Sequence, residues 1–245
     1  MKSYTKILLH LTIKKTTAVK KLLFLLLIAP LFFISSCEEE KGPIHGCLDS
    51  QACNYNPEAT LDNNSCEYAI EGYDCDGNIT EYIVGMEAEG GIVFYLDETG
   101  EHGLVAALED LEGLYEWGCV GKYVNGADRQ AIGTGYQNTL NIINQGCTTY
   151  NGGINGGITA AQAALDAEIN GYSDWYLPSK DELVEMNNAI GYGSPEGNIG
   201  GFSIYYYWSS TGGGNYGAWY VSFPDGNTGA ISKTNPGRVR VIRAF

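Results

Sequence analysis

The sequence is short of basic residues and of histidine, and it lacks an apolar run long enough to cross a membrane as a helix. It holds 14 lysines and arginines against 29 aspartates and glutamates, with three histidines. Nucleic acids, anionic lipids and other polyanions are therefore poor partners. Divalent cations, neutral glycans and basic proteins suit this charge better. The apolar run at residues 22–33 has about a dozen residues, whereas a membrane-spanning helix needs roughly twenty.

That apolar run lies in a segment typical of an export signal. Lys20 and Lys21 precede it, and Ile34-Ser35-Ser36-Cys37 follows it. A charged start, a short apolar core and small residues before a cysteine predict a lipoprotein signal peptide over residues 1–36. We expect Cys37 to carry fatty acyl groups, two or three of which suffice for stable membrane anchoring. An ordinary thiol after a plain secretory leader is the alternative.

Removal of this leader would leave a strongly acidic chain, which we expect to be an outer-membrane lipoprotein of a bacterial cell envelope. The leader contains six of the 14 basic residues and no acid, so eight basic residues remain against 29 acidic ones, a formal net charge of −21. Residues 37–45 are interpreted as an acidic tether. The three glutamates at 38–40 fit a surface-export signal and a solvated linker equally well.

The remaining cysteines divide the chain into a small and a large part. Exported proteins retain disulfides, so six cysteines predict three bonds. No pair has CxxC spacing or a Cys/His metal pattern, which favours structural bonds over redox chemistry. The two that stand alone are expected to pair with each other, and the first four allow three connectivities. The first four are Cys47, Cys53, Cys66 and Cys75, and the other two are Cys119 and Cys147.

Residues 46–80 form a Cys-rich module with many Asn and Asp residues and too few apolar ones for a core of its own. Its pattern of GC, ACNYNP and SC resembles a short module of secreted Bacteroidota proteins that often stands near surface or adhesive domains. Asp62 and Asn64 offer the hard oxygen ligands that Ca²⁺ requires. Clusters of this kind also form plain turns.

Residues 81–245 are predicted to form one α+β domain. The apolar segments 90–96 and 104–108 flank an acidic turn, which predicts a β-hairpin. Helices are expected over 158–169 and from Ser179 to about Ile190, the second opened by a capping box of Ser179 and Glu182. Strands are then expected at 205–210, 218–223 and 238–245. We expect the last of these to share a sheet with the first hairpin.

Four segments of this domain carry a family resemblance. They are DWYLPSKDEL at 174–183, YWSST at 207–211, AWYVSF at 218–223 and RVRVIR at 238–243. In this order they resemble the bacterial family named for the C-terminal domain of the Legionella collagen-like protein, over roughly residues 85–245. That family is similar to C-type lectin-like domains. The resemblance therefore implies two helices, two small sheets and long loops that bind glycans or surface ligands. It implies no catalytic activity.

A glycan site needs exposed aromatic rings to stack on a sugar, and amides or carboxylates to bind its hydroxyls. The region from 191 to 228 is rich in both and in glycine. It lacks the Glu-Pro-Asn and Trp-Asn-Asp signatures of calcium-dependent C-type lectins, and a loop without a small ligand is the alternative. The candidate ligand-binding residues are Tyr192, Tyr205, Tyr206, Asn215, Tyr216, Asp225 and Asn227.

Other prominent side chains are expected to be structural. Trp175, Trp208 and Trp219 are large enough to dominate a small core. Arg238, Arg240 and Arg243 are expected to pair with acidic residues. Residues 81–120 hold ten acids and no lysine or arginine, which predicts a solubilising surface or a second calcium site at Asp97, Glu98 and Glu101.

Together these features predict a surface-anchored binding or adhesion lipoprotein that recognises a glycan or an extracellular protein. A structural or envelope-assembly lipoprotein with a protein partner is the alternative. An enzyme is not expected, because His102 is the sole histidine of residues 81–245. Thiol chemistry of the kind used by formylglycine-generating enzymes, which share a related fold, would require Cys119 and Cys147 to be free.

Overall fold

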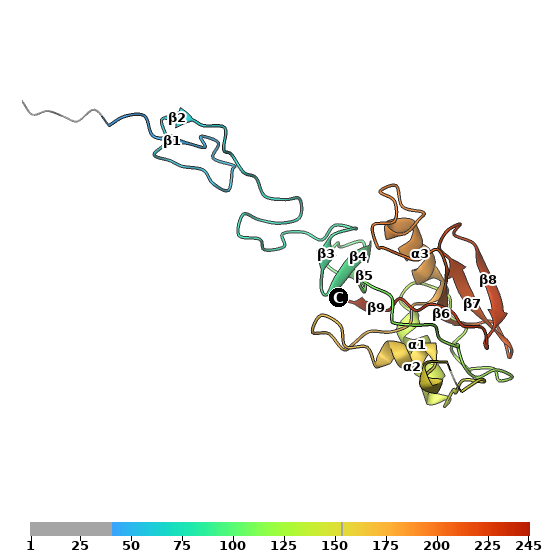
Figure 1. The fold of residues 1–245 in the computed structure, drawn as a ribbon. Helices are drawn as coiled ribbons and strands as arrows, with labels where there is room; N and C mark the ends of the chain where they lie inside the picture. Colours follow the sequence, from blue (N-terminus) through green and yellow to red (C-terminus); the bar gives the residue numbers. More distant parts are fainter. Residues whose placement is uncertain (1–40, 153) are drawn as a thin grey trace, which may run out of the picture. The chain divides into compact units, whose positions relative to one another are not determined.

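The computed structural model describes residues 41–152 and 154–245. The chain divides into two units, Met1–Ile44 and His45–Phe245, and the second contains every helix and strand that is described (Figure 1). The predicted signal peptide and Cys37 lie outside the described residues. Within the described ranges, no helix combines the length and the hydropathy needed to cross a bilayer.

Two disulfides and one short pair of strands hold the Cys-rich module. β1 (His45–Gly46) pairs in parallel with β2 (Leu61–Asp62). Cys47 is bonded to Cys66 and Cys53 to Cys75, which selects one of the three connectivities that the sequence allows. Few side chains of this module are buried. The covalent bonds therefore replace a hydrophobic core, by restricting the unfolded chain.

The first sheet of the large domain brings the two ends of that domain together. Its strands are β3 (Glu87–Ala88), β4 (Gly91–Leu96), β5 (Gly103–Ala106) and β9 (Ile242–Ala244), in the order β3-β4-β5-β9. All neighbours are antiparallel. The predicted hairpin and its pairing with the last strand are both confirmed.

The last strand is shorter than the predicted 238–245 because residues 238–241 connect two sheets. The carbonyls of Val239 and Val241 accept from the backbone N–H groups of Leu111 and Ala107. On the other side, Arg238 accepts from the N–H of Trp208. The alternation of partners prevents a regular ladder over these residues.

The described part of the large domain contains three α-helices where the sequence predicts two, together with a 3₁₀ turn, η1 (Ile154–Gly157). The additional helix is α1 (Gly135–Asn144), whose buried face includes Asn138 and Thr139. These polar side chains bond to backbone carbonyls of Arg129, Gly135 and Leu177. A helix buried by hydrogen-bonded polar residues lacks the apolar period that sequence reasoning relies on.

The helix expected over 158–169 is shorter than predicted. α2 (Ala160–Leu165) begins after Thr159, whose side chain accepts from the N–H of Gln162, and ends at the cap residue Asp166. Beyond it, Asn170 has a φ of 52° and Gly171 one of 84°. This left-handed pair turns the chain back, so the backbone groups of Ile169 and Tyr172 bond to each other instead of continuing the helix.

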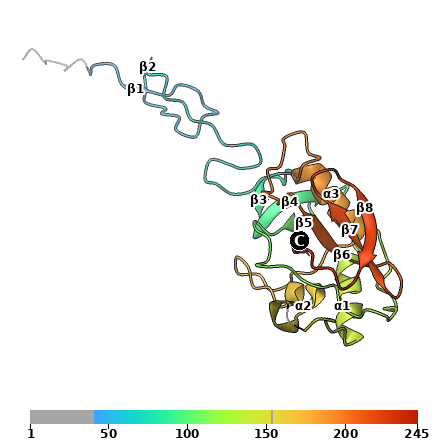
Figure 2. The same ribbon diagram turned by 45° about the vertical axis from the view of Figure 1, so that its right-hand side comes forward.

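α3 (Lys180–Ile190) begins as predicted, with a complete capping box between Ser179 and Glu182. It packs against β4 of the first sheet and against the second sheet. The second sheet contains β6 (Tyr206–Gly212), β7 (Gly217–Ser222) and β8 (Thr228–Ser232), in that antiparallel order. Figure 2 shows α3 beside these strands and β8 as the outermost of them.

Aromatic residues fill two clusters of buried side chains in the large domain. Trp117, Trp175 and Trp208 are fully buried in one cluster with side chains of α1 and α2. Phe94, Tyr207 and Phe223 lie in a second cluster with the apolar face of α3. Trp175 and Trp208 are core residues as predicted. Trp219 is only partly buried, and the ammonium of Lys180 lies 5.8 Å from its ring centre.

Candidate functional site

A groove of about 500 Å³ crosses one face of the second sheet. Its apolar lining comes from Ile204, Tyr205, Tyr206, Tyr220, Pro224 and Ile231. Its polar lining comes from Ser222, Asp225, Asn227 and Asn235. We call this set of residues the tyrosine groove.

The pairing of the strands places these side chains on a common face. Tyr206 of β6 lies opposite Ser222 of β7, and Tyr220 of β7 lies opposite Gly229 of β8. Since alternate residues of a strand share a face, Tyr206, Tyr220 and Ser222 point to the same side. A Cβ at Gly229 would lie 3.0 Å from the ring of Tyr220, so glycine allows that ring to lie over β8.

The aromatic rings of the groove contact one another. Tyr205 and Tyr206 are stacked, with centroids 4.9 Å apart and planes 19° apart, and Tyr220 lies 5.2 Å from Tyr206. The hydroxyl of Tyr206 donates to the carbonyl of Pro236 at 2.7 Å, and burial raises its pKa to about 12. Tyr205 is 38% exposed and Ile204 76% exposed. The groove therefore presents a fixed aromatic surface to solvent.

A carboxylate and an amide lie beside the rings. Asp225 accepts from the backbone N–H of Asn227 at 3.2 Å and from its side-chain amide at 2.6 Å. A hydrogen bond from Ser222, followed by those from Asn227, lowers the pKa of Asp225 below its usual range. The carboxylate is therefore ionised at neutral pH, and it accepts hydrogen bonds from hydroxyl groups.

A buried ionic network around Asp110 holds the segment 203–207, which precedes and begins β6. Asp110 receives the Nε of Arg240 at 2.8 Å and the hydroxyl of Tyr207 at 2.8 Å. Arg238 approaches the same carboxylate at 3.4 Å, and its guanidinium lies 6.0 Å from the ring of Tyr205. Ser203 also donates to Asp110 at 3.4 Å. These contacts fix residues 203–207, which carry the stacked tyrosines.

The structure brings four of the seven predicted ligand-binding residues together in the groove: Tyr205, Tyr206, Asp225 and Asn227. Tyr192 lies apart and donates to the carbonyl of Phe202. Asn215 and Tyr216 lie in the turn between β6 and β7, outside the groove lining. Sequence reasoning missed Tyr220 and Ile231, which only the pairing of β7 with β8 brings to this face.

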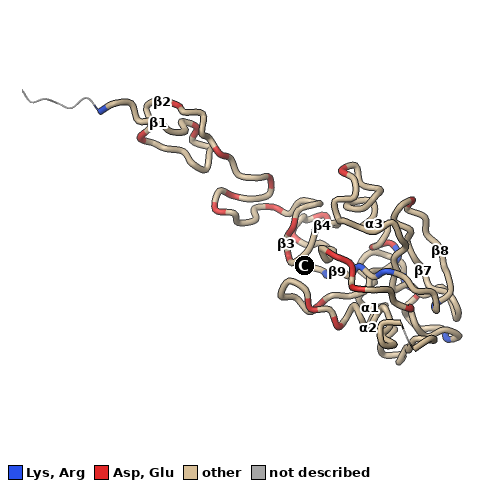
Figure 3. Tube along the Cα trace, in the orientation of Figure 1, with Lys and Arg blue, Asp and Glu red and all other residues tan. Residues whose placement is uncertain are grey.

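The arginine prediction is confirmed. Arg238 and Arg240 pair with Asp110, and Arg243 pairs with Asp174 at 2.8 Å and with Glu89 at 3.5 Å. Figure 3 shows acidic residues along the chain from β1 to β3. Between Lys41 and Lys122 the sequence has no lysine or arginine to pair with them.

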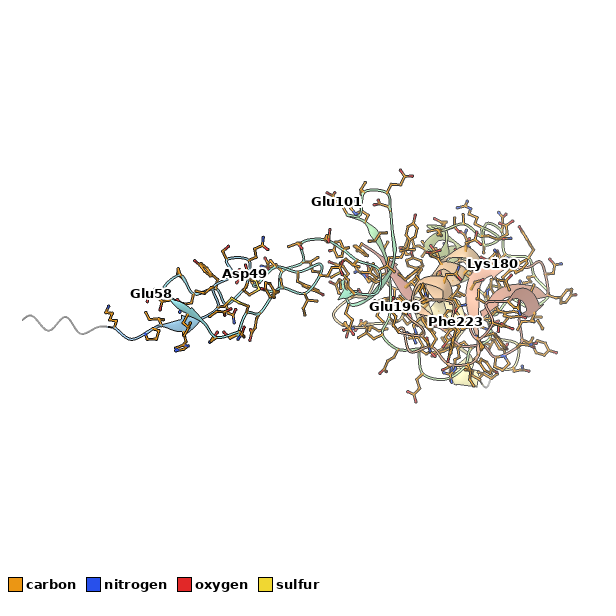
Figure 4. All side chains as sticks on the ribbon, turned by 90° about the horizontal axis from the view of Figure 1, so that it is seen from above. Asp49, Glu58, Glu101, Lys180, Glu196 and Phe223 are labelled. Atoms are coloured by element: carbon orange, nitrogen blue, oxygen red, sulfur yellow. A yellow bond between two sulfur atoms is a disulfide. The ribbon has the colours of Figure 1, made fainter. Side chains whose placement is uncertain are left out.

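The residues predicted to bind calcium form local turns. Asp62 accepts from the N–H of Asn64 at 2.9 Å. Asp97 accepts from Thr99 and Gly100, and the hydrogen bond from the Thr99 hydroxyl lowers its pKa. Glu98 and Glu101 are exposed in the same turn, with Glu101 at its tip (Figure 4). Among the described residues, no three His, Cys, Asp or Glu side chains are grouped to hold a metal ion.

The sulfur atoms of Cys119 and Cys147 are joined, as the sequence predicts. The bond closes the chain over a sequence separation of 28 residues. In this state neither sulfur is the free thiol that a cysteine-based reaction would require.

A buried lysine follows β8. The Lys233 side chain is fully buried, donates to the carbonyl of Lys122 at 2.8 Å, and lies 4.5 Å from the ring centre of Trp117. Burial lowers its pKa to about 8, compared with about 10.4 in an unfolded chain. Between these values the unfolded chain binds more protons, so stability rises with pH through this window.

We expect the free energy of unfolding to increase by about 1–2 kcal/mol between pH 7.5 and 9.5, since the hydrogen bond and the aromatic ring offset part of the burial effect. Denaturant unfolding at a series of pH values measures this increase. Lys233→Met keeps the apolar contact without the charge and should remove the increase. An equal slope in both proteins would contradict the assignment. The tyrosines with raised pKa begin to lower the free energy of unfolding as the pH approaches 10, and they do so equally in the Lys233→Met variant.

The fold and the groove together define a mixed α+β domain, stapled by a disulfide, with an aromatic surface over its second sheet. Residues 128–243 match the family described as the Lcl C-terminal domain. The match extends over somewhat less than half of the chain, from α1 to β9, and supports the family resemblance over that length.

A fimbrial protein from Bacteroides ovatus is among the solved structures that resemble the chain, with a TM-score of 0.44 and 18% identity over 76% of this chain. The chain covers half the length of that protein. No curated protein matches the sequence.

Proposed function

We propose that the chain is a surface-anchored lipoprotein that acts as an adhesion module and binds a glycan or another extracellular ligand in the tyrosine groove. The observation that carries the proposal is the stacked pair of Tyr205 and Tyr206 beside Asp225 and Asn227. Aromatic faces pack on the apolar side of a sugar, while a carboxylate and an amide bind its hydroxyls.

The other parts of the chain fit this role. Acyl groups on Cys37 would anchor the protein in the outer membrane, and the Cys-rich module would serve as a protease-resistant spacer. The match to the Lcl C-terminal domain covers the groove. A lectin-like use of the loops follows from the family resemblance and forms part of the proposal.

A glycan panel tests the groove. We expect the purified chain to bind at least one glycan, and Tyr205→Ala to weaken that binding by about tenfold or more, as for a central aromatic contact. Tyr216→Ala is the matched control, because Tyr216 is 69% exposed but lies outside the groove lining. Equal losses in the two variants would contradict a site in the groove.

Melting temperatures recorded in calcium and in EDTA, alongside the glycan panel, test the predicted sites at Asp62 and Asp97. A lower melting temperature in EDTA would support calcium binding, and an unchanged one would contradict it. Failure of every glycan to bind would contradict the glycan proposal and favour an envelope-assembly role with a protein partner.

A further inference from the structure

β8 is an edge strand without the usual protection against pairing. Its sequence is TGAIS, with no charged residue and no proline. β7 is its neighbour in the sheet, and Figures 1 and 2 show no other element of the described chain on the outer side of β8. Natural edge strands usually carry charge, proline or a bulge that prevents another strand from adding.

The register shows which backbone groups of β8 face outward. The N–H of Lys233 bonds to Tyr216, and the N–H of Ser222 bonds to Asn227. Asn227 and Lys233 therefore direct backbone groups to β7. Every second residue of a strand faces the same neighbour, so Gly229 and Ile231 do so as well. The intervening residues Thr228, Ala230 and Ser232 direct theirs away from the sheet, and all three are exposed.

We propose that β8 pairs antiparallel with β8 of a second copy of this chain, so that two three-stranded sheets become one six-stranded sheet. The two-fold axis passes between the Ala230 residues of the two copies. Thr228 then lies opposite Ser232 of the second copy, a combination of hydroxyl residues that stabilises cross-strand pairs. The three outward residues of each strand supply about six backbone hydrogen bonds in this register.

Charge does not oppose a second copy at this edge, unlike most of the surface. The chain carries a formal net charge of −15, so most approaches of one copy to another bring carboxylates together. In the proposed register Asp225 lies opposite Asn235 of the second copy, and no two acidic residues of the segment 225–235 face each other. The small side chain of Ala230 leaves room for close contact at the axis.

The pairing bears on the groove. A two-fold axis perpendicular to the sheet keeps both tyrosine grooves on the same face. With strands about 4.8 Å apart, the two β7 strands lie about 15 Å from each other. Two grooves at this spacing would bind a repeating ligand with higher avidity than one. That consequence rests on the proposed function, whereas the pairing itself does not.

Cysteine substitution tests the pairing. Opposed residues in a hydrogen-bonded antiparallel pair have Cα atoms about 5.5 Å apart, within reach of a disulfide. Under mild oxidation of the full chain, Ala230→Cys should form a covalent dimer at least tenfold faster than Thr228→Cys or Ser232→Cys. Each control cysteine lies about 13 Å from its equivalent, four residues along the strand. The unsubstituted chain supplies the background rate.

A mixture of the Thr228→Cys and Ser232→Cys chains should crosslink, because these two positions face each other. Equal rates for Ala230→Cys and the two single controls would overturn the proposal. Binding of a glycan by a chain that stays monomeric would do the same, while leaving the groove assignment intact.

Charge reversal supplies an independent measurement. Ala230→Glu and Ala230→Lys each place two like charges at the axis, so each variant should run as a folded monomer. Mixing the two variants should restore the dimer mass, because opposite charges then meet. Dimers that persist in both single variants would place the contact elsewhere on the molecule and overturn the proposal.

Discussion

Replacement of Asp110 by alanine is expected to lower the free energy of unfolding by about 3–5 kcal/mol. Asp110 binds Arg240, whose side chain is only 1% exposed. Arg240 also donates to the carbonyls of Ala107, Leu108 and Gly200, so it cannot move to solvent without breaking these contacts. Loss of the carboxylate leaves a buried positive charge without its counter-ion, which explains the size of the effect.

Thermal unfolding measures this prediction, because about 2–4 °C of melting temperature corresponds to 1 kcal/mol in a chain of this size. Asp110→Asn keeps the shape of the side chain and removes only its charge, so it should still be strongly destabilised. Tyr207→Phe removes the hydroxyl that donates to the same carboxylate and accepts from the N–H of Ser203, and it should cost about 1.5–3 kcal/mol. A loss below 1 kcal/mol for Asp110→Ala would show that the network contributes little to stability.

The sequence predicts those parts of the fold that depend on neighbouring residues. The capping box of Ser179 and Glu182 marks the start of α3 correctly, since its spacing is fixed by the first turn of a helix. The hairpin of β4 and β5 follows from two apolar segments and a turn. The bond between Cys119 and Cys147 follows from the absence of other cysteines nearby.

The parts that the sequence does not predict depend on long-range contacts. α1 is buried through Asn138 and Thr139, whose hydrogen bonds reach Arg129 and Leu177. These polar side chains have no apolar period to recognise. Similarly, the sequence indicates that Arg240 pairs with an acid, but only the fold brings Asp110 to it from 130 residues away.

The groove also combines residues that local sequence indicates with residues that only long-range contacts bring together. Tyr205, Tyr206, Asp225 and Asn227 are recognisable as candidate binding residues because they lie in one glycine-rich stretch. Tyr220 and Ile231 belong to strands, and their place in the groove follows from the register between β7 and β8. A shift of one residue would send them to the opposite face. Register is a property of the assembled sheet, so local sequence does not reveal it.

Removal of the bond between Cys119 and Cys147, through Cys119→Ala and Cys147→Ala, is expected to destabilise the large domain by about 3–4 kcal/mol. The bond restricts the unfolded chain over a separation of 28 residues. It also closes the segment that contains α1 and that supports α3. In that segment Gly133 donates to Glu182, and Gln130 accepts from the N–H of Asp181.

Tryptophan fluorescence provides the measurement, because all four tryptophans lie in residues 117–219 and report on the large domain. The matched control is Cys47→Ala with Cys66→Ala, which removes a bond of 19 residues in the Cys-rich module. That control should leave the tryptophan transition in place, since the module has no tryptophan and its bonds do not enter the large domain. An equal shift in both double variants would contradict separate stabilisation. An unchanged transition without the bond between Cys119 and Cys147 would show that the packing of α1 alone holds this segment.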